Sequence, residues 1–223
     1  MRTQGFTTCL VLALINAPPA PAQSSNPAKE NSGSEVTRDG ALPAGWSARP
    51  DGTAEVKDVK FVTMAPGYHL TLGPATILYR ERDRATGPFH TLAKFHQMKK
   101  LKHSEGYGLF LGGQGLAGKD QEYTYFLVRD DGSYLIKRRE GEKTTDVSKG
   151  WVSHSAVKKA DADGKATNLL EIDAKQNPSK VEFKVNGQTV HATEAKKMTT
   201  KGIVGLRVNH NLDLHIEDFD IHQ

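Results

Sequence analysis

Short runs in which apolar and polar residues alternate fill the chain from about residue 44 to its end. Alternation with a period of two is typical of strands that bury one face. The runs that predict strands are 68–72, 75–80, 107–111, 123–129, 133–139, 168–174, 181–185, 188–192, 202–208 and 212–221. A single helical turn is predicted, at 156–162. Ten or so strands joined by turns predict an all-β sandwich or jelly roll.

Turn residues predict how some of these strands pair. The dipeptide Asn186-Gly187 is typical of a two-residue hairpin turn. Such a turn pairs Phe183 with Val190 and places His191 on the polar face of the hairpin. In the last run, the apolar positions change parity near Glu217-Asp218. Either a bulge lies there or the strand moves from one sheet to the other.

The first 43 residues differ from the rest of the chain. Residues 1–22 combine Arg2 with the apolar run 9–17 and end on the small-residue site Ala20-Pro21-Ala22, which is the pattern of a secretory signal peptide. Residues 23–43 are polar, rich in Ser, Gly and Pro, and predict a flexible leader. The globular domain is therefore predicted at 44–223, in a protein that is bacterial and periplasmic or secreted.

Composition excludes several classes of function. Cleavage of the signal removes Cys9, the only cysteine, so thiol catalysis, disulfides and cysteine-bound metals are not expected. The 30 basic and 26 acidic residues are scattered, which does not favour nucleic acid as a partner. No apolar run after the signal reaches 18 residues, so no membrane anchor is expected. The motifs of serine hydrolases, zinc hydrolases and nucleotide-binding loops are absent from the sequence.

The hairpin centred on Asp131-Gly132 carries the strongest candidate binding residues. A two-residue turn there pairs Val128 with Leu135 and predicts an opposite face that is rich in tyrosine and arginine. Tyrosine rings stack on the apolar face of a sugar ring, and guanidinium groups donate paired hydrogen bonds to hydroxyls. The alternative is that the tyrosines belong to the core and the arginines reach past the sheet edge. The candidate residues on this face are Tyr125, Arg129, Tyr134 and Arg138.

Further candidates lie outside this hairpin. Trp151 and His154 follow Gly150 between two strands, where the indole is either a platform for a sugar or a plug at one end of the sandwich. Glu171 and Asp173 share one strand face, so they are either an acid–base pair or part of a solvated surface. No metal or other cofactor is predicted. The loop 161–164 (DADG) is the nearest candidate for calcium, and it lacks a diagnostic spacing.

Several short motifs also occur in a known group of folds. They are Gly45-Trp46, 151–154 (WVSH), 185–187 (VNG), 205–207 (GLR) and 219–221 (FDI). In this order they resemble the laminin-G-like jelly rolls of the concanavalin A-like lectin/glucanase superfamily. Within it, the chain is most similar to the 3-keto-disaccharide hydrolase family. The resemblance implies a concanavalin A-like jelly-roll sandwich from about Leu42 to the C-terminus.

Three functions stay open at this point. The first is an exported module that binds a carbohydrate or glycoconjugate without catalysis. The residues expected to bind this ligand are Tyr125, Arg129, Tyr134, Arg138, Trp151 and His154. The second, which the family resemblance implies, is a glycoside hydrolase that uses Glu171 and Asp173. The third is a structural or protein-binding module. The sequence does not indicate the ligand or the oligomeric state.

Overall fold

A computed structural model describes residues 42–223, whose strands form two antiparallel sheets. Sheet A contains, in spatial order, β1 (Ser47–Pro50), β4 (Thr76–Ala85), β14 (Gly202–Val208), β6 (Tyr107–Gln114), β7 (Glu122–Arg129), β8 (Ser133–Glu140) and β10 (Val152–Ser153), with β9 (Lys143–Asp146) also paired to β8. Sheet B contains β13 (Gln188–Glu194), β12 (Lys180–Val185), β11 (Ala166–Asp173), β5 (His90–Gln97), β15 (Asp213–His222), β3 (Tyr68–Leu72) and β2 (Val59–Thr63).

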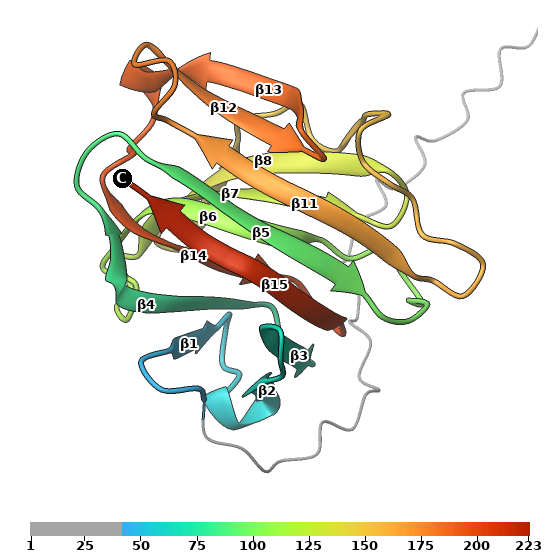
Figure 1. The fold of residues 1–223 in the computed structure, drawn as a ribbon. Helices are drawn as coiled ribbons and strands as arrows, with labels where there is room; N and C mark the ends of the chain where they lie inside the picture. The colour runs from blue at the N-terminus through green and yellow to red at the C-terminus, as the bar shows by residue number, and fades with distance from the viewer. Residues whose placement is uncertain (1–41) are drawn as a thin grey trace, which may run out of the picture. The chain divides into compact units, whose positions relative to one another are not determined.

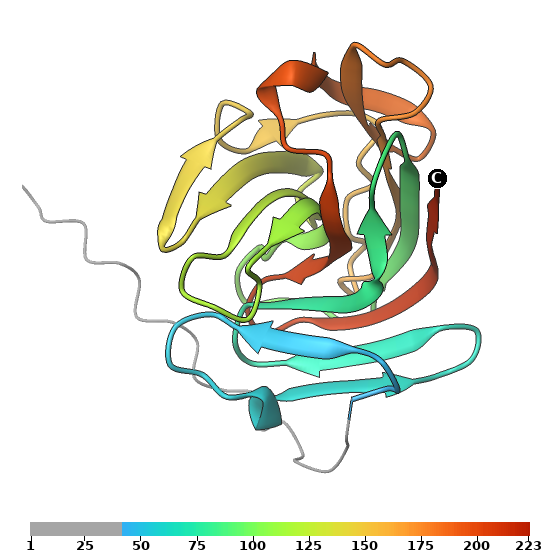
Figure 2. The same cartoon turned by 90° about the vertical axis from the view of Figure 1, so that its left-hand side faces the viewer.

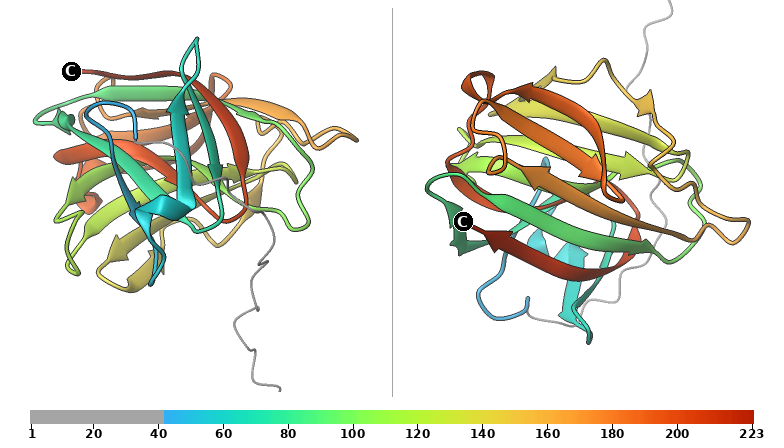
Figure 3. Two further views of the ribbon diagram at one scale, coloured as in Figure 1. Left: turned by 90° about the horizontal axis from the view of Figure 1, so that it is seen from below. Right: turned by 45° about the horizontal axis from the view of Figure 1, so that its top comes forward.

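The two sheets lie face to face. In Figure 1, β11, β5 and β15 of sheet B lie in front of β6, β7 and β14 of sheet A. Figure 2 shows the same two layers from the side. The right-hand view of Figure 3 shows sheet B in front of sheet A again, after a tilt. The all-β class and the sandwich architecture predicted from the alternating runs are therefore confirmed.

The main core lies between the sheets and is made by one face of each strand. Phe95, Phe126, Phe183, Leu70 and Leu206 are fully buried there. Burying a side chain of this size contributes roughly 1.5–3 kcal/mol. Because side chains alternate between the two faces of a strand, every second residue of these strands points away from the core.

The β7–β8 hairpin differs from the prediction by one residue. Its loop contains three residues, 130–132, so that Arg129 pairs with Ser133 and Val128 pairs with Tyr134. Gly132 adopts a left-handed conformation with φ of 87° and donates its N–H to the carbonyl of Arg129 at 3.2 Å. A left-handed glycine after a turn is typical of the three-residue hairpin loop. The predicted pairing of Val128 with Leu135 is therefore wrong.

The β12–β13 hairpin also departs from its predicted register. A bulge between Phe183 and Lys184 pairs Phe183 with His191 instead of Val190. The rings of Phe183 and His191 lie 6.0 Å apart. Burial in this position lowers the pKa of His191. The prediction that His191 belongs to the polar face is wrong, because the bulge adds one residue and reverses the side-chain parity.

The C-terminal strand confirms the predicted bulge. The register of β15 against β5 shifts between Glu217 and Asp220, and Asp218 has φ of 57°. Both halves of the strand stay in sheet B.

The helices of residues 42–223 are two short 3-10 turns, η1 (Val56–Asp58) and η2 (Ala195–Lys197), so the helical turn predicted at 156–162 is wrong. Neither is long enough or apolar enough to cross a membrane.

Candidate ligand-binding site

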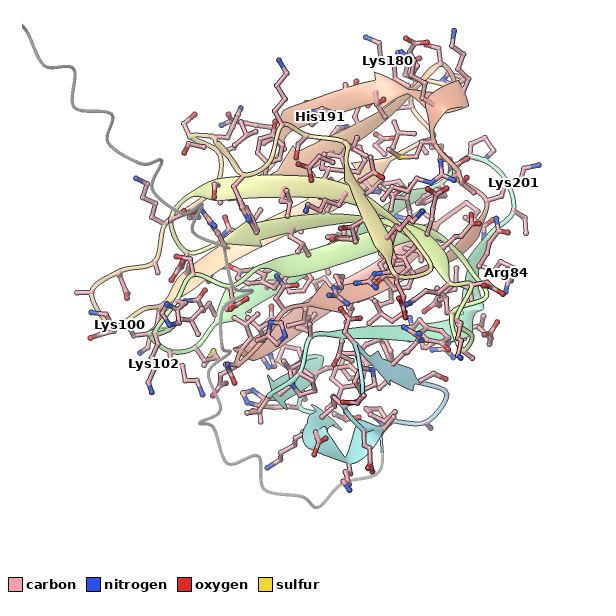
Figure 4. All side chains as sticks on the ribbon, turned by 180° about the vertical axis from the view of Figure 1, so that it is seen from behind. Arg84, Lys100, Lys102, Lys180, His191 and Lys201 are labelled. Atoms are coloured by element: carbon pink, nitrogen blue, oxygen red, sulfur yellow. The ribbon has the colours of Figure 1, made fainter. Side chains whose placement is uncertain are left out.

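The outer face of sheet A, which points away from the main core, carries a second cluster of buried apolar and aromatic side chains. Figure 4 shows the protein from this side. The cluster comes from β4, β6, β7, β14 and the β6–β7 loop, and Trp151 packs against it. An outer sheet face in a two-layer sandwich is ordinarily polar. The members of this cluster are Ile77, Tyr79, Phe110, Leu116, Tyr123, Tyr125, Leu127 and Ile203.

A buried ion pair lies in the middle of this face. Arg207 on β14 has a side chain that is only 5% exposed. Its Nη1 donates to Oδ1 of Asp51 at 2.9 Å and its Nη2 donates to Oδ2 at 2.6 Å. The two parallel bonds form the fork that an arginine makes with a carboxylate. Asp51 directly follows β1, so the pair joins segments that are 156 residues apart in sequence.

A second arginine and two tyrosines complete the polar part of the face. Arg139 on β8 donates from Nη2 to Oδ2 of Asp51 at 3.1 Å. The hydroxyl of Tyr123 lies 3.5 Å from Nη1 of Arg207. The guanidinium carbon of Arg207 stands 5.7 Å from the ring centre of Tyr125. We call Asp51, Tyr123, Tyr125, Arg139 and Arg207 the outer-face cluster.

Electrostatics fix the charge states of this cluster. Burial alone would raise the pKa of Asp51, but the hydrogen bond and charge of Arg207, followed by the charge of Arg139, lower it below the usual value. Burial raises the pKa of both Tyr123 and Tyr125. Burial opposes the charge of Arg207, and its anionic and hydroxyl neighbours nevertheless raise its pKa. At neutral pH, the cluster therefore holds one carboxylate, two guanidinium groups and two neutral phenols.

Three buried polar atoms on this side of the molecule have no hydrogen-bond partner within the protein. They are Nε of Arg139, Nε of Arg207 and Oε1 of Gln121. Gln121 directly precedes β7 and has the same parity as Tyr123, so it belongs to the same face of sheet A. Buried polar groups are nearly always satisfied by protein or by water. Two donors and one acceptor on this side are therefore left without a partner within the protein.

Trp151 and Arg129 extend the face toward the β7–β8 loop. The guanidinium carbon of Arg129 lies 4.3 Å from the ring centre of Trp151, which is a cation–π geometry. Arg129 also donates from Nε to Asp131 at 2.8 Å and to Ser133 at 3.0 Å. The partly exposed indole is thus held between an arginine and the apolar cluster.

The structure separates the residues that the sequence grouped into one binding face. Tyr125 and Arg129 lie on the outer face of sheet A, and Trp151 packs against its apolar cluster. Tyr134 lies in the main core instead, because the three-residue loop moves it to the opposite side of β8. Arg138 has the parity of Tyr134 and pairs with Glu140 at 2.8 Å. The predicted common face for Tyr125, Tyr134 and Arg138 is therefore wrong.

His154 is tied to the loop that follows β10. Its Nδ1 accepts the backbone N–H of Ala156 at 3.1 Å. Its ring centre lies 6.4 Å from that of Tyr134. These contacts link His154 to the core side of β8, where Tyr134 lies.

Glu171 and Asp173 lie on the outer face of sheet B, on the other side of the main core from the outer-face cluster. Oε2 of Glu171 lies 3.0 Å from Nε2 of His90. Oδ2 of Asp173 accepts from Lys184 at 2.9 Å, and its Oδ1 accepts two backbone N–H groups of the following turn. Burial would raise the pKa of Asp173, but these bonds lower it to about 2. Asp173 therefore stays ionised and terminates β11.

The outer face of sheet B also carries a row of histidines. His69, His215 and His96 lie opposite one another on β3, β15 and β5. The rings of His96 and His215 are 5.8 Å apart. Within residues 42–223, no group of three or more His, Cys, Asp or Glu side chains converges as metal ligands would. In the loop named for calcium, Oδ1 of Asp161 accepts the N–H groups of Asp163 and Lys165.

Sequence reasoning missed Asp51, Gln121, Arg139 and Arg207 as functional candidates. Arg207 is the only charged residue in the run 202–208 (GIVGLRV), and a charge within an apolar strand is an available signal. Asp51 and Gln121 lie outside any strand, so no periodicity marks them.

Comparisons with known proteins identify the fold. No protein-family model matches the sequence, and no curated protein matches it. Among solved structures, a carbohydrate-binding module, CBM66 from Bacillus subtilis, matches with a TM-score of 0.56 and 11% identity, over 80% of this chain and 96% of that one. The carbohydrate recognition domain of Emp46p matches with a TM-score of 0.53 and 12% identity, over 80% and 88%.

A β-glucanase from Bacillus licheniformis matches with a TM-score of 0.52 and 10% identity, over 81% of this chain and 92% of the glucanase. At these identities the likenesses show the fold alone. Together with the two antiparallel sheets, they identify a concanavalin A-like jelly-roll sandwich.

Proposed function

We propose that this protein binds carbohydrate on the outer face of sheet A and does not cleave it. One observation carries the proposal: an outer sheet face holds a buried charged cluster with donors and an acceptor that lack partners. Burying charges is unfavourable and does little for the stability of a core. Buried ionisable groups with strongly shifted pKa values cluster at functional sites, which supports a binding role for this face.

The chemistry of the face fits a sugar. A saccharide presents hydroxyl groups that both donate and accept, matching the free Nε–H groups of Arg139 and Arg207 and the free oxygen of Gln121. Its C–H faces pack against aromatic rings such as the partly exposed indole of Trp151, and the phenol of Tyr125 adds a hydroxyl group to the same face. Two of the similar structures are named for carbohydrate binding or recognition, which supports the proposal at the level of the fold.

Binding suits this face better than hydrolysis does. Cleavage of a glycosidic bond uses two carboxyl groups, one of which must be able to donate a proton. On this side, Asp51 and Asp131 are each held by arginine, and Asp146 is held by Lys137. A lowered pKa leaves Asp51 without a proton to give at neutral pH.

The compartment remains part of the proposal. The signal predicted at 1–22 and nearly all of the leader predicted at 23–43 lie outside the described residues. With that signal, we propose that the ligand is met in the periplasm or outside the cell.

A glycan array of the purified protein, followed by calorimetric titration of the best ligand, tests this proposal. We expect saturable binding to one class of saccharide. Tyr125→Phe removes one hydroxyl from the outer face, and we expect at least a threefold loss of affinity. Tyr134→Phe removes the same group from the main core and is the matched control, expected to leave affinity unchanged. Absence of binding across the array, or equal losses in both variants, would refute the proposal.

A further inference from the structure

The outer-face cluster has one more positive charge than negative charge. Arg139 and Arg207 both donate to the single carboxylate of Asp51. Tyr123 and Tyr125 do not compensate, because burial raises the pKa of each phenol and keeps it neutral.

The neighbouring charged groups leave this excess in place. Arg49, which also influences Asp51, adds a further positive charge and donates to the carbonyl of Gly118 at 3.1 Å. The next carboxylate on this side, Asp146 of β9, lies 3.1 Å from Nζ of Lys137 and is neutralised by it. Arg129 is likewise paired with Asp131. Glu81, whose charge acts on the neighbouring Tyr79, is paired with Arg84 at 3.1 Å. Each of these three carboxylates is therefore paired with a basic residue outside the cluster.

A buried excess charge of this kind cannot relax by losing a proton. Arginine stays protonated in proteins, unlike lysine or histidine. The side chains of Arg207 and Arg139 are only 5% and 15% exposed, so water screens them poorly. The Nε–H groups of both arginines are buried and have no acceptor. An anion that accepts these two hydrogen bonds would supply both the missing charge and the missing partner.

We propose that the carbohydrate bound on this face is an acidic one, whose carboxylate or sulfate group accepts hydrogen bonds from Nε of Arg139 and Nε of Arg207. This inference rests on the proposed function of the same face and names its ligand class. In this arrangement the anionic group lies at the two Nε–H groups, because the Nη atoms of both arginines already donate to Asp51 and to the carbonyl of Gly141. The sugar hydroxyls then lie toward Gln121 and Tyr125, with Trp151 on the same face.

Paired saccharides test this inference directly. The affinities of a uronic acid oligosaccharide, a sulfated oligosaccharide and a neutral oligosaccharide of matched linkage are measured by calorimetry. We expect at least one acidic ligand to bind tenfold or more tightly than the neutral one. Raising the salt concentration from 0.05 to 0.5 M is expected to change this ratio only slightly, because salt screens a buried charged contact much less than an exposed one. The two acidic ligands distinguish carboxylate from sulfate as the recognised group.

Two variants locate the effect in the cluster. Arg139→Gln is expected to lower the ratio of acidic to neutral affinity at least fivefold. Arg138→Gln, which changes the neighbouring arginine on the opposite side of β8, is the control and is expected to leave the ratio unchanged. Gln121→Glu keeps both arginines, adds a carboxylate on the same face and is expected to lower the ratio at least fivefold. It covers the case in which Arg139→Gln does not fold.

The outcomes separate this inference from the proposed function. Equal affinity for acidic and neutral ligands overturns the inference and leaves carbohydrate binding intact. A preference that survives both Arg139→Gln and Gln121→Glu also overturns it, because the charge then acts elsewhere. Failure of all saccharides to bind refutes the proposed function itself.

Discussion

The contribution of the ionised Asp173 side chain to the free energy of unfolding can be tested directly. Its Oδ1 accepts the N–H groups of Lys175 at 3.0 Å and Gln176 at 2.9 Å, and its Oδ2 accepts from Lys184 at 2.9 Å. The side chain is only 9% exposed. Asp173→Asn keeps an oxygen for the turn and removes the charge that Lys184 requires. We therefore expect the variant to fold and to be less stable.

The magnitude follows from the lowered pKa. The folded protein lowers the pKa of Asp173 from 3.8 to about 2, which corresponds to about 2 kcal/mol of stability. A lowered pKa stabilises the fold above the unfolded value of 3.8, and the contribution is lost as the pH falls toward 2. The deficit of Asp173→Asn in the free energy of unfolding should be about 2 kcal/mol at pH 7 and about half of that at pH 3.

Urea unfolding followed by circular dichroism at the two pH values measures both numbers. Glu182→Gln is the matched control, since Glu182 lies 3.6 Å from the same Lys184 but is more exposed. An exposed pair contributes about 0–1 kcal/mol, so the control should lose less than Asp173→Asn does. An Asp173→Asn variant as stable as the parent at pH 7, or a deficit that does not shrink at pH 3, would refute this reasoning.

Three further substitutions test packing and the binding face. Asn186→Ala removes hydrogen bonds to two backbone groups and to Asn168 at a residue with φ of 51°, and should cost about 2–4 kcal/mol in thermal unfolding. Gly205→Ala places a Cβ 2.5 Å from the ring of Phe110 and should cost about 1–3 kcal/mol by the same measurement. Trp151→Ala should weaken ligand binding about tenfold in a calorimetric titration, equal to about 1.4 kcal/mol. A neutral result at any of the three sites contradicts the role given to it.

Local patterns predicted the fold because each strand buries one face. The run 68–72 is β3 itself, and 202–208 is β14. The pairing register of β7 with β8 was harder to predict than the strands themselves, because the dipeptide Asp131-Gly132 is compatible with two different hairpin loops. In a two-residue loop it forms the whole turn, whereas here Gly132 is the third residue of the loop 130–132. One residue of difference moves Tyr134 from the outer face to the core.

The candidate site could be predicted only in part. Tyr125 and Arg129 were named because aromatic and basic residues share one face of the predicted hairpin, and Trp151 because it follows Gly150 between two strands. Asp51 and Arg207 were not, because nothing local shows that the segment after β1 reaches β14. That proximity comes from the sheet order, in which β4 pairs with both β1 and β14.

The long separation between Asp51 and Arg207 bears on how the protein is made. During synthesis the ribosome adds Arg207 156 residues after Asp51, which at ~5–20 residues per second takes roughly 8–30 s. Over that interval Asp51 has no partner on β14, and the strands on either side of β14 in sheet A cannot join through it. A nascent chain arrested before β14 should therefore retain no affinity for the ligand. Ligand binding thus reports that β14 has taken its place between β4 and β6.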